Sequence, residues 1–178
     1  METYKIKSQK ELEKFKDEFG YYVKGNLEAN CSLDIEKRLK VDGYLSIEAG
    51  ESIKAGESIE AGWSIKAGGS IEAGWSIKAG ESIEAGGSIE AGEYYGISAG
   101  LSITCKESLS FGLKAFAGIK TWGEATEEDK TITCGKLVKG EVAYGILNET
   151  GLTSETKTGK KVKIRLAEGN IVEGEIID

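Results

Sequence analysis

Residues 45 to 92 read LSIEAG ESIKAG ESIEAG WSIKAG GSIEAG WSIKAG ESIEAG GSIEAG, eight consecutive repeats of six residues. Side chains alternate between the two faces of a strand, so the Ile and Ala of each repeat share one face and the Ser and the Glu or Lys share the other. A glycine ends each repeat at a turn. An α-helix is excluded, because an Ile at every sixth residue would wander around the helix surface. The repeat therefore predicts a series of short strands.

Short strands joined by such tight turns are typical of a parallel solenoid, whereas an antiparallel meander needs longer hairpin loops between strands of this length. We therefore predict a mainly β fold, a triangular single-stranded parallel β-helix with three hexads per coil. The isoleucines and alanines should stack inside it as continuous ladders.

The charged residue at the fourth position of each hexad tests the length of the coil. These residues alternate in sign from Glu48 to Glu84. An odd number of hexads per coil places opposite charges on neighbouring strands, and an even number places like charges there, which is unfavourable. With three hexads per coil, the predicted neighbours are Glu48 with Lys66, Lys66 with Glu84, Glu60 with Lys78, Lys54 with Glu72, and Glu72 with Glu90.

The six-residue period continues on both sides of the perfect repeats. Leucines recur six apart from Leu27 to Leu45, which adds about one degenerate coil upstream. Downstream, Glu93 and Tyr94 form a two-residue insertion, after which the period resumes as far as Gly118. The predicted β-helix spans residues 27–118 and has about five coils.

The N-terminal segment, residues 1–26, is expected to be a helical cap over the first coil. Ser8 followed by Glu11 matches a capping box. An amphipathic helix over residues 8–19 would cover the open edge of the solenoid, and docking of this helix to a partner is the alternative. Its apolar residues are Leu12, Phe15 and Phe19.

The C-terminal segment, residues 119–178, is expected to be an antiparallel β extension. Residues 162–176 read VKIRLAEGNIVEGEI and alternate on both sides of a turn at residues 167–170. This pattern predicts a terminal β-hairpin.

The composition limits the partners of the chain. It has 25 glycines, no proline, a formal net charge of -7 and a pI near 4.9. Such an acidic chain is a poor binder of phosphates, so no direct nucleic-acid partner is expected, and a basic protein is electrostatically favourable. The N-terminus has no apolar stretch suited to a signal peptide or a membrane span, so we expect a cytoplasmic protein without membrane association.

Residues suited to catalysis or cofactor binding are scarce. The chain has no histidine, and Cys31, Cys105 and Cys134 lack the paired spacing of a zinc site or a disulfide framework. Glutamates exposed on a flat sheet make poor acid-base groups, and the sequence has no glycine-rich phosphate loop. We therefore expect a non-enzymatic protein with no catalytic residues, no cofactor and no metal site.

In its six-residue period the chain resembles the hexapeptide-repeat parallel β-helix proteins. The best known are sugar and amino-acid acyltransferases, which place a small residue two before the aliphatic one and use a histidine base. The order Ile-x-Ala-Gly over residues 27–118 is more similar to bactofilins, the polymer-forming β-helix proteins of bacteria, and to hexad-repeat proteins carried by bacteria and their phages. This resemblance implies end-to-end assembly, whereas folded caps at both ends would give a monomer or a small closed oligomer.

The first position of the hexad varies more than the others, and it lies at a turn. It holds two of the three tryptophans, a residue type enriched at binding hot spots. The alternative interpretation is that each Trp folds over a turn to cover Gly or Ile. Three hexads per coil would place Leu45 beside Trp63 and Glu57 beside Trp75. The candidate protein-interaction residues are Trp63, Trp75, Leu45, Tyr94, Tyr95, Glu57 and Glu81.

The leading functional hypothesis is a non-enzymatic β-helical scaffold or protein-interaction module that binds a protein partner or associates with itself. The alternative is a phage-type acidic inhibitor of a host nucleic-acid-binding defence protein, similar to an anti-CRISPR protein. It rests on the eight Glu and three Lys of residues 45–92, a local charge of -5. A third hypothesis is a relative of the hexapeptide acyltransferases.

Overall fold

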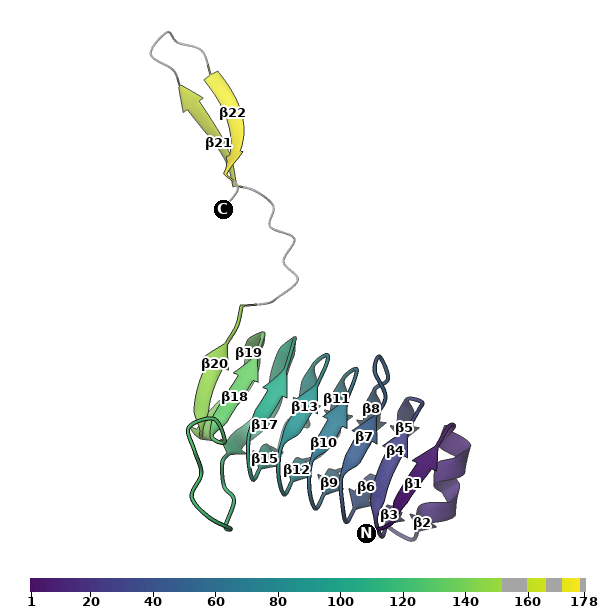
Figure 1. Cartoon of the computed structure of the whole chain (residues 1–178). Coiled ribbons are helices and arrows are strands. Elements are labelled where there is room, and N and C mark those ends of the chain that lie inside the picture. Colours follow the sequence, from purple (N-terminus) through teal and green to yellow (C-terminus); the bar gives the residue numbers. More distant parts are fainter. Residues whose placement is uncertain (152–159, 166–170, 177–178) are drawn as a thin grey trace.

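The computed structural model describes residues 1–151 and the strand backbones of residues 160–165 and 171–176. The chain forms a parallel β-solenoid of about six turns with one short helix (Figure 1). This confirms the predicted mainly β solenoid, and the number of turns exceeds the predicted five. The strands form an eight-stranded sheet, a twelve-stranded sheet and a separate two-stranded pair.

The eight-stranded sheet runs the length of the rod, and its strands are parallel. In spatial order they are β1 (Thr3–Ile6), β4 (Asn26–Ala29), β7 (Leu45–Ile47), β10 (Ile65–Ala67), β13 (Ile83–Ala85), β16 (Ile103–Cys105), β18 (Thr131–Cys134) and β20 (Ile146–Glu149).

The twelve-stranded sheet has two limbs joined by one long strand, β17 (Ser108–Ala117), on which β19 (Lys136–Tyr144) lies. The first limb contains β5 (Leu33–Ile35), β8 (Ile53–Ala55), β11 (Ile71–Ala73) and β14 (Ile89–Ala91). The second limb contains β2 (Lys16–Asp17), β3 (Gly20–Val23), β6 (Arg38–Val41), β9 (Ile59–Ala61), β12 (Ile77–Ala79) and β15 (Ile97–Ala99).

Within the perfect repeats each strand pairs with the strand three further along the chain. Ile65 lies opposite Ile83 and Ile71 opposite Ile89. The expected charge pairs follow from this register. The Nζ–Oε distance is 2.6 Å for Lys54 with Glu72 and 3.0 Å for Lys66 with Glu84. Both pairs are exposed, so they contribute mainly to register.

The predicted pairing of Glu48 with Lys66 is wrong, because the partner of Lys66 is Ser46. Ala49 and Gly50 form a wider turn, and Gly50 adopts a φ of +84° that favours glycine. Leu45 therefore lies opposite Ile65 and takes the place of a repeat isoleucine. The first hexad thus follows the upstream leucine register, and the repeat register begins with β8.

The turn at Ala49 and Gly50 is thus a two-residue insertion, and the predicted insertion at Glu93 and Tyr94 is confirmed as a second one. Ile77 lies opposite Ile59 on one side and opposite Ile97 on the other, so the ladder absorbs two extra residues in this turn. The chain between the two strands forms a turn at the inserted residues. The insertion changes which residues meet at the corners of the solenoid.

The core is a stack of the inward-facing Ile and Ala side chains. The isoleucines from Ile59 to Ile89 are essentially inaccessible to solvent, and the alanines are nearly so. Burying one such isoleucine stabilises a fold by about 1.5–3 kcal/mol. Phe111 of β17 is also buried and lies against Gly140, which has no side chain to oppose the ring. Apolar burial therefore runs without interruption along the axis.

The glycine that ends each repeat allows consecutive turns to lie in direct contact. A Cβ atom at Gly74 would overlap the carbonyl oxygen of Gly56, and one at Gly80 would overlap that of Gly62. The serines close the same turns, since the N–H of Ser70 donates to Oγ of Ser52 at 2.9 Å. Gly and Ser thus allow the coils to stack at the distance of ordinary strand pairing.

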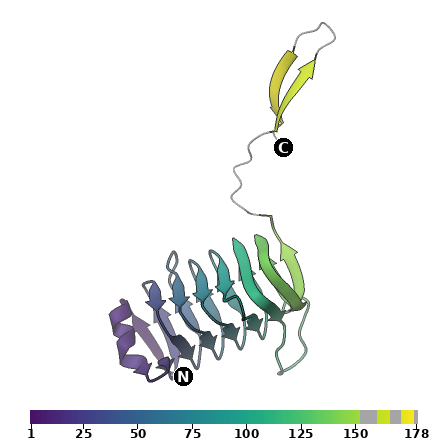
Figure 2. The ribbon, with the colours of Figure 1, turned by 180° about the vertical axis from the view of Figure 1, so that it is seen from behind.

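The N-terminal helix is shorter than predicted. It is a 3-10 helix, η1 (Gln9–Phe15), in which Leu12 is buried and Phe15 packs against the core. Phe19 is 57% exposed, since the chain leaves the helix at Lys16 and forms β2, which pairs antiparallel with β3. Pairing of Lys16 and Asp17 with the free edge of β3 thus replaces the last part of the predicted helix. Figures 1 and 2 both show the helix at the N-terminal end of the rod.

The parallel ladder extends beyond the predicted limits of 27–118. Upstream, β1 and β3 belong to it, so residues 1–26 contain more than a helical cap. Downstream, β18, β19 and β20 continue it in parallel, where an antiparallel extension was predicted. The terminal strands β21 (Lys160–Arg165) and β22 (Ile171–Ile176) pair antiparallel, and the predicted turn at 167–170 lies outside the described residues.

Deletion of one full turn should be tolerated far better than deletion of one hexad. Removing residues 65–82 joins Ser64 to Ile83 and keeps every downstream strand opposite an equivalent partner. Removing residues 69–74 shifts each later strand to a position on a different limb or sheet, where its neighbours are no longer equivalent. We expect cooperative thermal unfolding for the longer deletion and a strongly lowered melting temperature, or no folding, for the shorter. Equal melting temperatures would contradict the observed register.

A methyl group at a stacking glycine should be costly. Gly80→Ala places a carbon against the carbonyl of Gly62, so we expect destabilisation of about 1–3 kcal/mol, as for other overpacked sites. Gly50→Asn is the control, because Gly50 has open space and Asn tolerates a left-handed backbone. Denaturant unfolding of both variants measures the effect, and similar losses at the two sites would refute backbone contact as the reason for glycine.

Candidate functional site

One corner of the solenoid carries a row of exposed apolar side chains. Trp75 lies in the turn between β11 and β12, Tyr95 precedes β15 by two residues, and Leu113 lies within β17. The N–H of Leu113 donates to the carbonyl of Tyr95 at 2.9 Å, so these two residues occupy neighbouring coils. We call Trp75, Tyr95 and Leu113 the aromatic edge.

The rings of Trp75 and Tyr95 are stacked. Their centroids are 5.7 Å apart and their planes differ by 16°. Trp75 remains 44% exposed and Tyr95 37% exposed, so the pair is partly buried and still open to solvent. The two-residue insertion produces this contact, since it brings Tyr95 rather than Glu93 into the coil position beside Trp75. Both residues were predicted as candidates, but their contact was not.

The inserted residues lie beside the aromatic edge. Tyr94 is the most exposed large apolar side chain of the described residues, at 77%. Glu93 accepts a hydrogen bond from Nζ of Lys139 at 3.1 Å, which ties the insertion to β19. Glu57 precedes Trp75 on the same corner, and its carbonyl accepts from the N–H of Trp75 at 3.2 Å. The predicted neighbours Glu57 and Trp75 are thus observed.

Trp63 lies on a different corner, in the turn between β9 and β10, and is 44% exposed. Its N–H donates to the carbonyl of Gly43, and its own carbonyl accepts from the N–H of Glu81, both at 3.1 Å. The carboxylate of Glu81 also accepts from Oγ of Ser64 at 3.0 Å. The structure therefore separates Trp63 and Glu81 from the aromatic edge.

Leu45 does not belong to the exposed surface. It is 1% exposed and lies in the core of β7, so the predicted neighbour pair of Leu45 and Trp63 is wrong. The cause is the wide turn at Ala49 and Gly50, which moves Gly43 into the position beside Trp63. Leu45 is accordingly a packing residue.

Several exposed apolar residues were missed by the sequence analysis. Leu113 sits on the aromatic edge, and Trp122 is 55% exposed in a loop that reads as polar. This loop is anchored by Lys120, whose Nζ donates to Asp129 at 2.8 Å. The hydrogen bond from Lys120 lowers the pKa of Asp129 to about 2. A lone Trp between charged residues gives no periodic signal, so neither its exposure nor its anchor was predictable.

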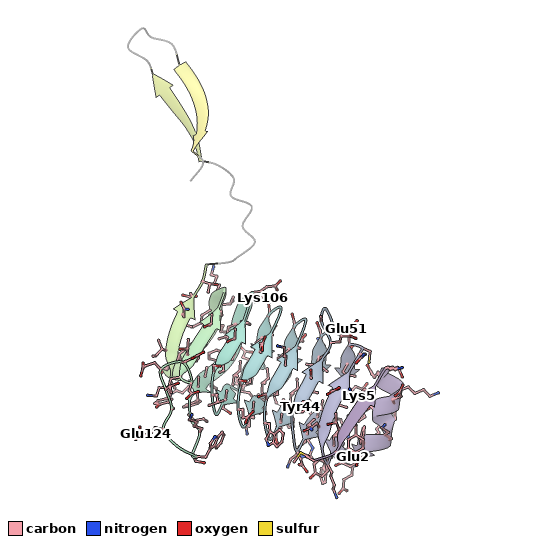
Figure 3. The ribbon with its side chains drawn as sticks, in the orientation of Figure 1. Glu2, Lys5, Tyr44, Glu51, Lys106 and Glu124 are labelled. Atoms are coloured by element: carbon pink, nitrogen blue, oxygen red, sulfur yellow. The ribbon has the colours of Figure 1, made fainter. Side chains whose placement is uncertain are left out.

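The polar network near the N-terminus serves to hold the first strand. Glu28 of β4 accepts from Nζ of Lys5 at 2.9 Å and from the hydroxyl of Tyr44 at 2.7 Å. Figure 3 labels Lys5 and Tyr44 on this side of the rod. These hydrogen bonds, that from Tyr44 first, lower the pKa of Glu28. The network joins β1 to β4 and to Tyr44, which lies directly before β7 in the next coil.

The three cysteines are free, and they differ in burial. Cys105 and Cys134 are buried in the core, while Cys31 is half-buried. Burial raises the pKa of the Cys105 thiol to about 12 and raises the pKa of both other thiols. All three are therefore poor nucleophiles near neutral pH.

The described residues contain no group of three or more His, Cys, Asp or Glu side chains placed to hold a metal ion. Only η1 is helical in this part of the chain, and it has neither the length nor the apolar character of a membrane-spanning helix.

Comparison with family models, with curated proteins and with solved structures found no match for this chain.

Thiol accessibility tests the assignment of the cysteines. In the native protein at pH 8, Ellman's reagent should modify one thiol per chain, that of Cys31, and unfolding should expose all three. The Cys31→Ser variant should show no fast-reacting thiol. Equal rates for three thiols in the folded protein would show that β16 and β18 are not buried as described.

Proposed function

We propose that this protein is a non-enzymatic β-helical scaffold that presents its aromatic edge to a protein partner. The stacked and partly exposed pair Trp75 and Tyr95 carries this proposal. Trp and Tyr are enriched at the energetic centres of protein interfaces, and exposed aromatic rows on a soluble protein are uncommon without a binding role.

The scaffold suits this role because it holds the two rings in place before binding. Trp75 and Tyr95 are attached to turns whose backbones are hydrogen-bonded to the neighbouring coils. Each side chain has only two rotatable bonds, and the stack restricts them further. Little conformational entropy is therefore lost when a partner covers the pair, which favours affinity.

We also propose that the coil has a triangular cross-section with three hexads per coil. Such a coil has three flat sides and three corners, and the aromatic edge lies along one corner. The order Ile-x-Ala-Gly supports a place among hexapeptide-repeat proteins similar to bactofilins or to the phage-carried hexad proteins. The acidic net charge of -7 and Glu57 beside Trp75 favour a partner with a basic surface around an apolar patch.

A quantitative interaction experiment tests the proposed function. Tagged protein is used to purify partners from the source cells, and the dissociation constant of each purified partner is then measured for Trp75→Ala, Tyr95→Ala and the control Trp122→Ala. We expect at least 10-fold weaker binding for the two edge variants, about 1.4 kcal/mol or more, and no change for the control. A partner bound equally by all variants would contradict the aromatic edge as the binding site. Saturable acyl transfer from acyl-coenzyme A would instead favour the acyltransferase hypothesis.

The inhibitor hypothesis has one observation in its favour. Glu72 and Glu90 are register partners on neighbouring strands, and like charges in this position are unfavourable for folding. Lys54 neutralises Glu72 and leaves Glu90 beside it. An acidic surface kept at a cost in stability suits the basic site of a nucleic-acid-binding protein.

The inhibitor hypothesis is tested with Glu90→Lys. This change restores charge alternation and should raise the stability of the rod slightly. If the protein is an inhibitor that acts through this surface, the Glu90→Lys variant should no longer inhibit the target nuclease. Its binding to that nuclease should also lose its dependence on salt. Unchanged inhibition by Glu90→Lys would exclude this surface.

A further inference from the structure

The two ends of the rod differ in how their strand edges are covered. At the N-terminal end the side chain of Gln9 acts like a strand residue. Its amide nitrogen donates to the carbonyl of Asp34 at 2.6 Å, and its oxygen accepts from the N–H of Asp34 at 2.9 Å. This pair of bonds closes the edge of β5, while β2 closes the edge of β3. The remaining edge strand, β1, carries charged Lys5, as edges that resist association often do.

The C-terminal end has no comparable cover among the described residues. The last strands are β20 on the eight-stranded sheet and β19 on β17. Leu147 lies opposite buried Ile132, so it continues the core file, yet it is 37% exposed. The exposed apolar residues of the two strands are Val138, Tyr144, Ile146 and Leu147. Within residues 1–151, the core of the solenoid is therefore left uncovered at this end.

We infer that two copies of this chain join tail to tail through β19 and β20. The surface to be covered is the whole end of a coil, since β20 ends one sheet and β19 lies along both limbs of the other. A single extended peptide pairs with one strand edge only. The same end of a second copy presents an edge of equal outline and an equally apolar centre.

Charge also favours a second copy at this end. The two strands carry Lys136, Lys139, Glu141 and Glu149, two positive and two negative residues that cancel. The chain as a whole has a net charge of -7, so most other faces of two copies would repel each other. Association through β19 and β20 avoids this repulsion.

The asymmetry of the ends determines the form of the assembly. A head-to-tail contact needs two open ends and continues into a fibre, whereas contact between identical ends closes after two copies. The rod has one open end among its described parts, so the assembly is a twofold dimer. This inference concerns a surface other than the aromatic edge and is independent of the proposed partner. A dimer would carry two aromatic edges and gain avidity for a partner with repeated sites.

Sedimentation equilibrium of the full chain tests the inference. The expected species has twice the 19.1 kDa mass of the chain. The double variant Val138→Lys and Ile146→Lys alters only exposed positions, and it should weaken dimerisation at least 30-fold while keeping the circular dichroism spectrum. Phe19→Lys, an exposed apolar residue near the other end, is the matched control and should remain dimeric.

Hydrogen exchange of the unmodified protein provides a second readout that does not depend on a variant. The amides of β20 should become more protected as protein concentration rises through the dimer range. A monomer at all concentrations would overturn the inference, and protection of β20 in that monomer would identify residues 160–176 as the cover. Filaments, or a double variant that folds and dimerises like the control, would overturn it as well.

Discussion

Consecutive coils of this protein touch backbone to backbone at the glycine that ends each repeat. No side chain fits between Gly80 and the carbonyl of Gly62, and the same holds for Gly74 over Gly56. The absence of a side chain leaves room for the spacing that the parallel hydrogen bonds impose, and these bonds align Ile over Ile and Ala over Ala. The core, the serine contacts and the ion pairs of Lys54 and Lys66 all depend on that alignment.

In a rod with such uniform packing, the structure can vary only where the six-residue repeat is interrupted or ends. Both two-residue insertions lie in turns, where extra residues leave the strands undisturbed. The first places Gly43 beside Trp63, and the second places Tyr95 beside Trp75. The structure can also vary at the ends of the rod, because a coil without a neighbour leaves its strand edges unpaired. The two interaction surfaces that we propose accordingly lie at an insertion and at an end.

Much of the fold could be predicted because every repeat demands the same environment. The pairing of Ile65 with Ile83 follows from period and charge alternation alone. The turn at Ala49 and Gly50 could not be predicted, because the hexad LSIEAG fits two registers. Ile47 can take the Ile position of the repeat, or Leu45 can take that position and leave Ile47 in the Ala position. Stacking of Leu45 on Leu27 decides between them, and it is a tertiary contact. The pairing of Ile103 with Ile132 crosses a long irregular loop and has no periodic signal. For the candidate site, composition at the first hexad position identified Trp75, while its contact with Tyr95 required the three-dimensional register.

The central claim is that a rigid parallel ladder, shifted by one insertion, brings Trp75 and Tyr95 into contact. Nuclear Overhauser effects between the indole protons of Trp75 and the ring protons of Tyr95 measure this contact in solution. The described register predicts strong cross-peaks between these two rings and none between Trp63 and Tyr95. Cross-peaks from Trp75 to Glu93 without any to Tyr95 would mean that the ladder continues without the insertion, and would contradict both the register and the aromatic edge.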